Sequence, residues 1–158
     1  MGNKISFVRK RRSLERLESI QELPFFSLNK KIDMCRVSKC YDGDTIHIVI
    51  FIKKRPYQLK CRLLGIDTAE IRGSGPAEKE FAYKTRDFLT SLILDKIIYV
   101  QFGEFDNFGR VLAHFYLDRD DIGSDNTLSQ HLINLKFGYE YYGKTKRPFS
   151  EWNDIDSD

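Results

Sequence analysis

The alternating apolar pattern between Thr45 and Ile52 constrains the fold of this chain more than any other feature. Isoleucine occupies every second position, at 46, 48, 50 and 52, which is typical of a strand with one buried face. The stretch Met34–Tyr41 also has the pattern of a strand, and the turn Asp42-Gly43-Asp44 separates the two. We expect an antiparallel hairpin in which Gly43 adopts a positive φ.

Further elements follow along the chain. We predict a third strand at Tyr57–Ile66 and two more at Lys96–Phe102 and Arg110–Leu117. Pro76 is a good first helical residue, and the helix behind it buries a stripe made of Phe81, Thr85, Phe88, Leu89 and Leu92. Asn126 or Thr127 caps a second helix, which runs from Leu128 to about Phe137 and is closed by Gly138.

The two ends of the chain carry weaker patterns. Apolar residues at 14, 17, 20 and 23 predict one short helix between Leu14 and Leu23, before Pro24. The segment Leu14–Phe26 could also cover part of the surface of the main domain. The stretch Tyr139–Asp158 is predicted to be irregular.

The order of these elements favours a small barrel. Strands that are joined by hairpins need no crossover helix, unlike strands of a parallel sheet. The predicted fold class is therefore α+β and mainly β, a five-stranded OB-fold barrel with about two helices plus a short N-terminal helix. We divide the 158 residues into a basic N-terminal extension at 1–31, the barrel domain at 32–143 and a tail at 144–158.

Composition indicates a globular protein in a reducing environment. Hydrophobic residues make up 41% and charged residues 31% of the chain, and the net charge of +3 is too small to identify a nucleic-acid partner. The three cysteines, Cys35, Cys40 and Cys61, are odd in number and lack Cys-x-x-Cys spacing, so we expect free thiols and an intracellular, cytoplasmic location. No apolar run approaches the length of a membrane span.

The first twelve residues carry a separate signal. Met1-Gly2-Asn3-Lys4-Ile5-Ser6 matches the acceptor pattern for N-myristoylation at Gly2, and the basic run Arg9–Arg12 follows. One acyl chain anchors a protein only marginally, so the basic run would supply the second contact with an anionic membrane surface. The alternative is a basic arm that is solvated or touches nucleic acid.

Three loops and one strand carry an unusual set of polar residues. The loops are Asp42-Gly43-Asp44, Asp67-Thr68-Ala69-Glu70 and Phe108-Gly109-Arg110, and Arg62 stands in the predicted third strand. A guanidinium for phosphate, a carboxylate for a metal and a second carboxylate for proton transfer are suited to cleaving a phosphodiester. Each motif alone is also a common turn or cap.

In this order the motifs resemble those of the staphylococcal-nuclease-like (thermonuclease) family. They are Asp-Gly-Asp-Thr at 42–45, Arg-Leu-Leu-Gly-Ile-Asp-Thr-Ala-Glu at 62–70 and Asp-Asn-Phe-Gly-Arg-Val-Leu-Ala at 106–113, and the resemblance spans about residues 34–143. It implies an OB-fold barrel and a Ca²⁺-dependent endonuclease that acts on DNA and RNA with little sequence preference. Other divalent ions remain open.

The resemblance also implies roles for individual residues. Asp44 and Asp67 would be carboxylate ligands of the metal, and Thr68 would offer its backbone carbonyl, since Ca²⁺ prefers hard oxygen ligands. Glu70 would orient or deprotonate the attacking water. Arg62 and Arg110 would grip the scissile phosphate, and these two arginines and Glu70 would form the catalytic set.

Substrate contacts are a further expectation. Phe108 stands where a tyrosine is common in the family. Tyr139, Tyr141 and Tyr142 could stack a base, and the segment after them, which contains Lys144 and Lys146, could follow the phosphate backbone. The tyrosines could equally pack against the barrel.

Two other functions stay open beside the nuclease. One is a catalytically silent OB-fold module that binds nucleic acid, although such a module would be free to lose Asp44, Arg62, Glu70 or Arg110, and this chain has all four. The other is a membrane-tethered adaptor that uses Gly2 and Arg9–Arg12. In each case we expect a monomer.

Overall fold

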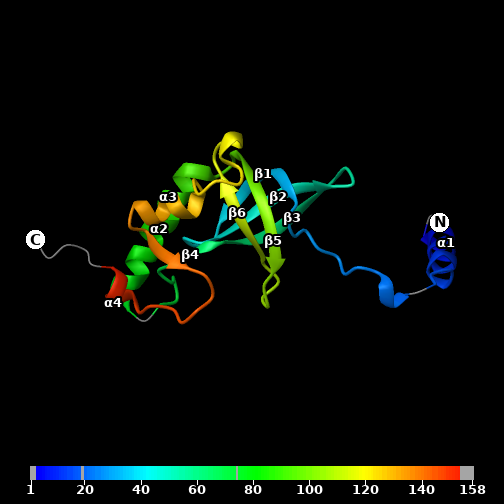
Figure 1. Cartoon of the computed structure of the whole chain (residues 1–158), viewed down its shortest axis with the longest axis horizontal. Coiled ribbons are helices and arrows are strands. Elements are labelled where there is room, and N and C mark those ends of the chain that lie inside the picture. The colour runs from blue at the N-terminus through cyan, green and yellow to red at the C-terminus, as the bar shows by residue number, and fades with distance from the viewer. Residues whose placement is uncertain (1–2, 19, 74, 154–158) are drawn as a thin grey trace, which may run out of the picture.

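A computed structural model describes residues 3–18, 20–73 and 75–153 (Figure 1). Four helices and seven strands lie in this part of the chain, together with two short 3₁₀ turns. In chain order they are α1 (Asn3–Glu15), η1 (Ile20–Glu22), β1 (Ile32–Cys40), β2 (Thr45–Ile52), β3 (Arg55–Leu63), β4 (Gly65–Thr68), α2 (Pro76–Ile93), β5 (Ile97–Phe105), β6 (Val111–Tyr116), η2 (Arg119–Asp121), α3 (Leu128–Asn134), β7 (Gly138–Tyr141) and α4 (Phe149–Trp152).

Five of the strands close into a barrel, as predicted. The strand order is β1-β2-β3-β6-β5, and β5 pairs back onto β1. Neighbouring strands are antiparallel except β3 and β6, which are parallel. The remaining strands, β4 and β7, form a separate antiparallel pair beside the barrel. The OB-fold expectation is therefore confirmed.

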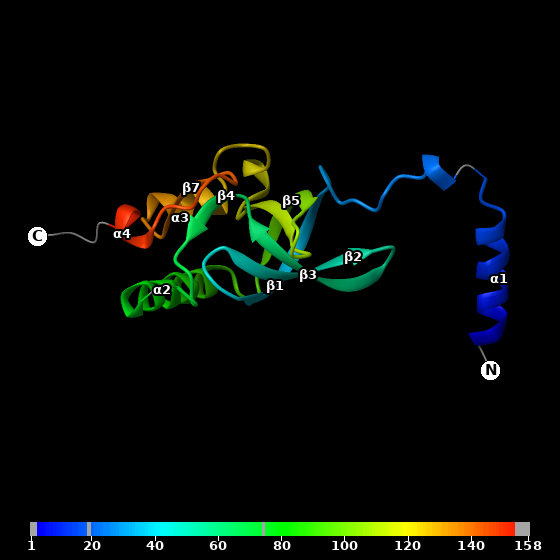
Figure 2. The ribbon, with the colours of Figure 1, turned by 90° about the horizontal axis from the view of Figure 1, so that it is seen from below.

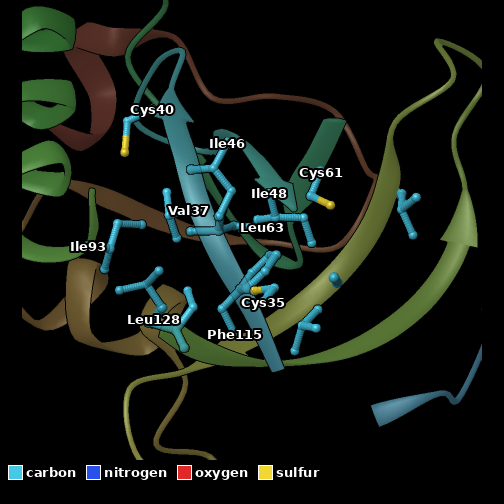
Figure 3. Packing of buried hydrophobic residues seen from close by; sticks show 14 of the residues in the cluster. Cys35, Val37, Cys40, Ile46, Ile48, Cys61, Leu63, Ile93, Phe115 and Leu128 are labelled. Atoms are coloured by element: carbon cyan, nitrogen blue, oxygen red, sulfur yellow. The ribbon is translucent and has the colours of Figure 1, made fainter. Parts of the chain in front are cut away.

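The barrel interior follows from the alternation in β2. Ile46, Ile48 and Ile50 are at most 1% exposed and pack among side chains from the other strands (Figure 3). Full burial of one such side chain contributes about 1.5–3 kcal/mol of transfer free energy. Cys35 and Cys61 also lie inside, as free thiols, and burial raises the pKa of both.

Two helices and the β4–β7 pair gather at one end of the barrel (Figures 1 and 2). Helix α2 begins at Pro76, as predicted, and buries Leu89 and Ile93 against the barrel core. Helix α3 is capped by Thr127, whose hydroxyl accepts a hydrogen bond from the backbone N–H of Gln130. These elements bring the loops of the sequence motifs to the same end of the molecule.

The predictions for the third strand and for the C-terminal segment were wrong. The predicted third strand is two strands, because Gly65, at φ +83°, redirects the chain after β3 and lets β4 pair with β7. The stretch Tyr139–Asp158 was predicted to be irregular, but its described part contains the end of β7 and the helix α4. The aromatic rings of Phe149 and Trp152 in α4 pack on Phe81 of α2.

The N-terminal helix also lies elsewhere than predicted. Helix α1 ends at Glu15, so only its last two residues and the 3₁₀ turn η1 fall within the predicted range Leu14–Leu23. The apolar residues of the N-terminal segment pack against no other described side chain, since every described side chain at 6–18 and 20–27 is exposed. The extension projects away from the barrel instead of covering it (Figures 1 and 2). Within the described residues, no helix combines the length and apolarity needed to span a bilayer.

Candidate active site

A guanidinium joins two carboxylates where the β1–β2 turn, β3 and β4 meet. Arg62 stands in β3 directly opposite Thr45 of β2. Its Nη1 donates to Oδ2 of Asp44 at 2.6 Å, and its Nη2 donates to Oδ1 of Asp67 at 2.8 Å. One forked side chain therefore fixes the spacing of the two acids.

Hydroxyl groups hold the other oxygens of these acids. The Thr45 hydroxyl donates to Oδ1 of Asp44 at 3.0 Å, and the Tyr139 hydroxyl donates to Oδ2 of Asp67 at 2.9 Å. Asp44 and Asp67 are only 4% and 3% exposed. Both carboxylates are thus held from two sides in a site that excludes most water.

The buried charges are incompletely balanced. Burial raises the pKa of Asp44, the nearby acids Asp42 and Asp67 raise it further, and Arg62 acts in the opposite direction. Burial alone would lower the pKa of Arg62, but Asp44 and Asp67 more than offset that and raise it. Arg62 alone supplies one positive charge against the two buried acids, and a second cation, Lys146, lies at Asp67.

Two glycines allow the backbone to approach the acids closely. Gly43 does not adopt the positive φ that we expected. Its role is steric, because an added Cβ would lie 2.6 Å from Cγ2 of Thr85 and 2.7 Å from Oγ1 of Thr68. A Cβ at Gly138 would lie 2.5 Å from the carbonyl oxygen of Asp67. Because both positions lack a side chain, the β1–β2 turn can lie close to Thr68 of β4, and β7 can lie close to Asp67 of β4.

A lysine from the segment after β7 completes the acidic cluster. Lys146 Nζ donates to Oδ1 of Asp67 at 2.9 Å and to Oε1 of Glu70 at 2.6 Å. Burial opposes the charge on this ammonium, but its hydrogen bonds to Glu70 and Asp67 dominate and raise its pKa. Glu70 itself is about half exposed, and its backbone N–H donates to Oε1 of Glu78.

Arg110 enters the site from the turn between β5 and β6. Asp106 accepts hydrogen bonds from the backbone N–H groups of Phe108 and Arg110 and from Nε of Arg110, at 2.7–2.9 Å. Burial would raise the pKa of Asp106, but these bonds lower it overall. Nη1 of Arg110 then donates to the Thr45 hydroxyl at 3.2 Å. Hydrogen bonds thereby link Arg110 through Thr45 to Asp44.

The residues expected to contact substrate divide into two groups. Phe108 is 83% exposed beside the Arg110 guanidinium. Tyr139 is buried between Trp152 and the Arg147 guanidinium, so the structure places it as a partner of Asp67 instead of as an open stacking surface.

The remaining pair of substrate candidates lies beyond β7. The Tyr141 hydroxyl donates to the carbonyl oxygen of Lys144, which positions this segment next to the site. Tyr141 is partly buried and lines a hollow together with Arg62 and Arg110, whereas the Lys144 side chain is exposed.

Hollows lie on both sides of Arg110 and Phe108. The first, of about 600 Å³, extends from Glu70 over the outer surface of β1, β2 and β3. The second, of about 490 Å³, extends toward Tyr141 and Tyr142. Arg110 and Phe108 line both, so a long substrate could pass over the site from one hollow to the other.

The donor set fits a hard, hydrated cation. Two carboxylates lie within the span of one guanidinium, and Thr68 follows Asp67 directly in β4, which puts a backbone carbonyl beside them. No group of three His, Cys, Asp or Glu side chains in the described part of the chain is arranged to hold a metal.

The comparison with protein families decides which fold family this is. The model described as staphylococcal nuclease homologue matches residues 60–151, more than half of the chain. The chain belongs to the staphylococcal nuclease family. A search of curated proteins gave no match. The part that matches the staphylococcal nuclease model includes Arg62, Asp67, Glu70 and Arg110, while Asp44 lies before it.

Sequence reasoning found the charged centre of this staphylococcal nuclease domain but not all of its supports. The structure brings Asp44, Arg62, Asp67 and Glu70 into one cluster and links Arg110 to it. Thr45 and Asp106 were not assigned a role at the site, and Lys146 was expected only to follow the phosphate backbone, not to contact the acids. Asp106 and Arg110 lie four residues apart on one short turn, which could have indicated that they pair. No such closeness in sequence connects Lys146 with the acids.

Proposed function

We propose that this staphylococcal nuclease domain is a metal-dependent endonuclease. It hydrolyses phosphodiester bonds of DNA and RNA with little sequence preference, and Ca²⁺ is its ion. The observation that carries this proposal is the cluster in which Arg62 bridges Asp44 and Asp67 while Glu70 and Arg110 lie at its edges. A partly exposed acid and a second arginine around a buried carboxylate bridge are the groups that phosphodiester hydrolysis needs.

The chemistry explains why these residue types are required. Water attacks phosphorus and forms a new P–O bond, the bond to the leaving oxygen breaks, and negative charge grows on the equatorial oxygens. Arg110 stands at the junction of the two hollows, where it can bind those oxygens with its forked donors. Arg62 is more enclosed and holds the two carboxylates as well as facing the phosphate.

Glu70 is the group that handles the proton. Its side chain is about half exposed, so water can reach its carboxylate, in contrast to those of Asp44 and Asp67. Glu70 accepts the proton of the attacking water, and solvent supplies a proton to the leaving oxygen. The Lys146 ammonium must release Glu70 for this step, since it donates to Oε1 in the structure.

Asp44, Asp67 and the Thr68 carbonyl would hold the ion. A bound Ca²⁺ supplies positive charge that stabilises the phosphate in the transition state. Two carboxylates and one carbonyl bind Ca²⁺ weakly compared with sites that have more charged ligands. We therefore propose that activity depends on a raised Ca²⁺ concentration, with other divalent ions as alternatives.

Cleavage of single-stranded DNA tests this proposal. Wild type, Glu70→Gln and the control Glu80→Gln are assayed with Ca²⁺, with Mg²⁺ and with chelator. Glu80 is an exposed acid on α2. We expect metal-dependent cleavage that falls by about 10²–10⁴-fold in Glu70→Gln and is unchanged in the control. Binding without cleavage under every metal condition would exclude the nuclease.

A silent nucleic-acid-binding module is the second candidate. The observation that favours it is the Lys146 ammonium, which already neutralises Glu70 and Asp67. In that case cations on the surface would bind nucleic acid, and the acids would serve only to order the loops. The same assay distinguishes the two functions, because a silent module binds the strand and releases no product.

For location, we propose an intracellular, cytoplasmic monomer that associates with anionic membranes through its N-terminus. Gly2 lies outside the described residues. The exposed run Arg9–Arg12 on α1 supports this proposal, because it lies on a segment that extends away from the barrel (Figure 2). Flotation with anionic vesicles tests it: the acylated chain should float, and replacing the four basic residues by glutamine should abolish flotation.

A further inference from the structure

Three cationic or titratable side chains form one row across the outer surface of the barrel. Lys39 of β1 pairs in register with His47 of β2, and His47 pairs with Lys60 of β3. The inward-facing neighbours Cys40, Ile46 and Cys61 are buried, so the side chains of the row point outward. We call Lys39, His47 and Lys60 the basic row.

The basic row lies one strand repeat from the catalytic centre. Thr45 and Arg62, also in register with each other, stand two residues before His47 and two residues after Lys60. Two residues advance a strand by about 7 Å. That step is comparable to the distance between successive phosphates of an extended single strand, so the basic row stands where the next phosphate of a bound chain would lie.

The hollow over these strands joins the basic row to the proposed active site. Its lining includes the three members of the row together with Glu70 and Arg110. Arg72 adds another cation to this lining, whereas Asp42 and Glu70 are the acids that it contains. Positive charge therefore predominates in the part of the hollow that lies away from Asp42 and Glu70. This charge distribution would attract a polyanion toward the site.

The pKa of His47 reflects how closely the two lysines of the row lie to it. Burial lowers the pKa of His47, and the charges of Lys39 and Lys60 on either side lower it further. Like charges this close repel one another, and among the described residues neither lysine forms an ion pair with a carboxylate. A bound phosphate would relieve that repulsion.

Aromatic rings beside the row indicate the kind of nucleic acid. Tyr41 and Phe108 both line the hollow, and they are 46% and 83% exposed. The Lys39 ammonium lies 5.6 Å from the centre of the Tyr41 ring. Exposed rings next to cations bind unpaired bases by stacking while the cations hold the backbone, which favours a single strand over a duplex.

We propose that the basic row is a phosphate-binding surface for a single-stranded polynucleotide. It holds the backbone of the strand on the side of Arg110 away from Tyr141, one to a few nucleotides from the bond to be cleaved. The proposal deepens the proposed function and rests on it, in that the strand held here is the strand cut at Glu70. The substrate class is accordingly a polynucleotide instead of a dinucleotide.

Binding measured without metal tests the surface apart from catalysis. Labelled oligothymidylates of two and of twelve nucleotides are titrated by fluorescence anisotropy in chelator, over a range of salt concentrations. The variant is Lys39→Gln with Lys60→Gln. The matched control is Lys53→Gln with Lys54→Gln, which removes the same charge from the β2–β3 turn, beyond the end of β2 and about 17 Å from His47 along that strand.

We expect the basic-row variant to bind the longer strand about tenfold more weakly, with unchanged affinity for the dinucleotide. For this variant, the slope of log affinity against log salt concentration should be shallower by about 1.4. That change corresponds to the loss of two phosphate contacts. The control should behave as wild type, and thermal melting should verify that both variants fold. Equal losses in variant and control, or tighter binding of a duplex than of the single strand, would overturn the proposal.

The two proposals fail in distinguishable ways. If the wild type binds the strand through the basic row but cleaves nothing with any metal, the nuclease is excluded and the surface stands. If the wild type cleaves and the basic-row variant binds and cleaves the longer strand as well as the wild type does, the surface is excluded and the nuclease stands.

Discussion

At the scale of single residues, Lys146 would compete with the metal ion of the proposed active site. Its ammonium donates to both Asp67 and Glu70. An ion bound between the acids has to displace this positive charge, so wild type should bind Ca²⁺ more weakly than a variant that lacks it. The Lys146 side chain is 46% exposed, so solvent screens the effect and keeps it moderate.

We therefore expect Lys146→Met to bind Ca²⁺ more tightly, by about two- to tenfold, in isothermal titration calorimetry. Methionine keeps the length of the side chain and removes only the charge and the hydrogen bonds. Lys144→Met is the control, because Lys144 is an exposed lysine two residues away that lines neither hollow. Unchanged or weaker Ca²⁺ affinity in Lys146→Met would mean that the ion does not need the position of the ammonium.

The same residue shows which parts of a site a sequence can reveal. Asp44, Arg62 and Asp67 belong to short motifs, each of which lies on one strand end or turn, so their grouping could be predicted. Lys146 reaches the acids only because the segment after β7 folds back onto β4, a contact that depends on tertiary structure. For Tyr139 the sequence left open whether the ring stacks on a base or packs against the barrel, and in the structure the ring is buried against Trp152.

At the scale of elements, the β1–β2 turn depends on a glycine for space. We expect Gly43→Ala to lower the free energy of unfolding by about 1–3 kcal/mol, since the added methyl group would overlap Thr85 and Thr68. Urea denaturation measures this difference. Gly75→Ala is the control, because a Cβ there meets nothing within 4 Å. A loss equal to that of the control would show that the turn can shift without cost.

The turn between β5 and β6 should be sensitive to pH through Asp106. Its hydrogen bonds lower its pKa in the folded state below the ordinary value of 3.8. The carboxylate therefore stabilises the fold fully above the unfolded pKa, and this contribution is lost as the pH falls through the folded pKa.

Replacing Asp106 by asparagine should consequently reduce stability in a pH-dependent way. We expect a loss of about 1 kcal/mol at neutral pH that shrinks below about pH 4, in urea denaturation of wild type and Asp106→Asn side by side. The exposed Asp125 provides the control, and Asp125→Asn should match wild type throughout. A difference that stays constant with pH would indicate that the charge of Asp106 contributes nothing.

The elements that could be predicted are those whose residues carry their own pattern. Strand β2 was predicted with its correct bounds because its isoleucines alternate, and α2 was predicted to begin at Pro76, where it does begin. Strand β7 has four residues and no alternation long enough to recognise, and its partner β4 lies about seventy residues earlier. Its existence depends on the redirection of the chain at Gly65, which only the assembled fold reveals.

At the scale of the whole molecule, the N-terminal extension and the barrel are physically separate. Helix α1 forms from local interactions, and the spacing of apolar residues at 14–23 misled the prediction because no surface lies nearby to bury them. The first buried side chain of the described chain is Leu28, which is 5% exposed. Lys30 then begins the backbone hydrogen bonds to the barrel by donating to the carbonyl oxygen of Phe102.

This boundary predicts how far the chain can be shortened. Removal of residues 1–27 should leave the melting temperature and the cleavage rate of the barrel unchanged, because every described side chain removed is exposed. Removal of residues 1–30 differs by three residues and should cost about 2–4 kcal/mol, since it takes away the buried Leu28 and the hydrogen bond from Lys30. Calorimetric melting of both shortened chains beside the full chain measures the two effects. A large loss already on removing residues 1–27 would mean that the extension packs on the barrel in solution, and it would then not be available to bind a membrane surface.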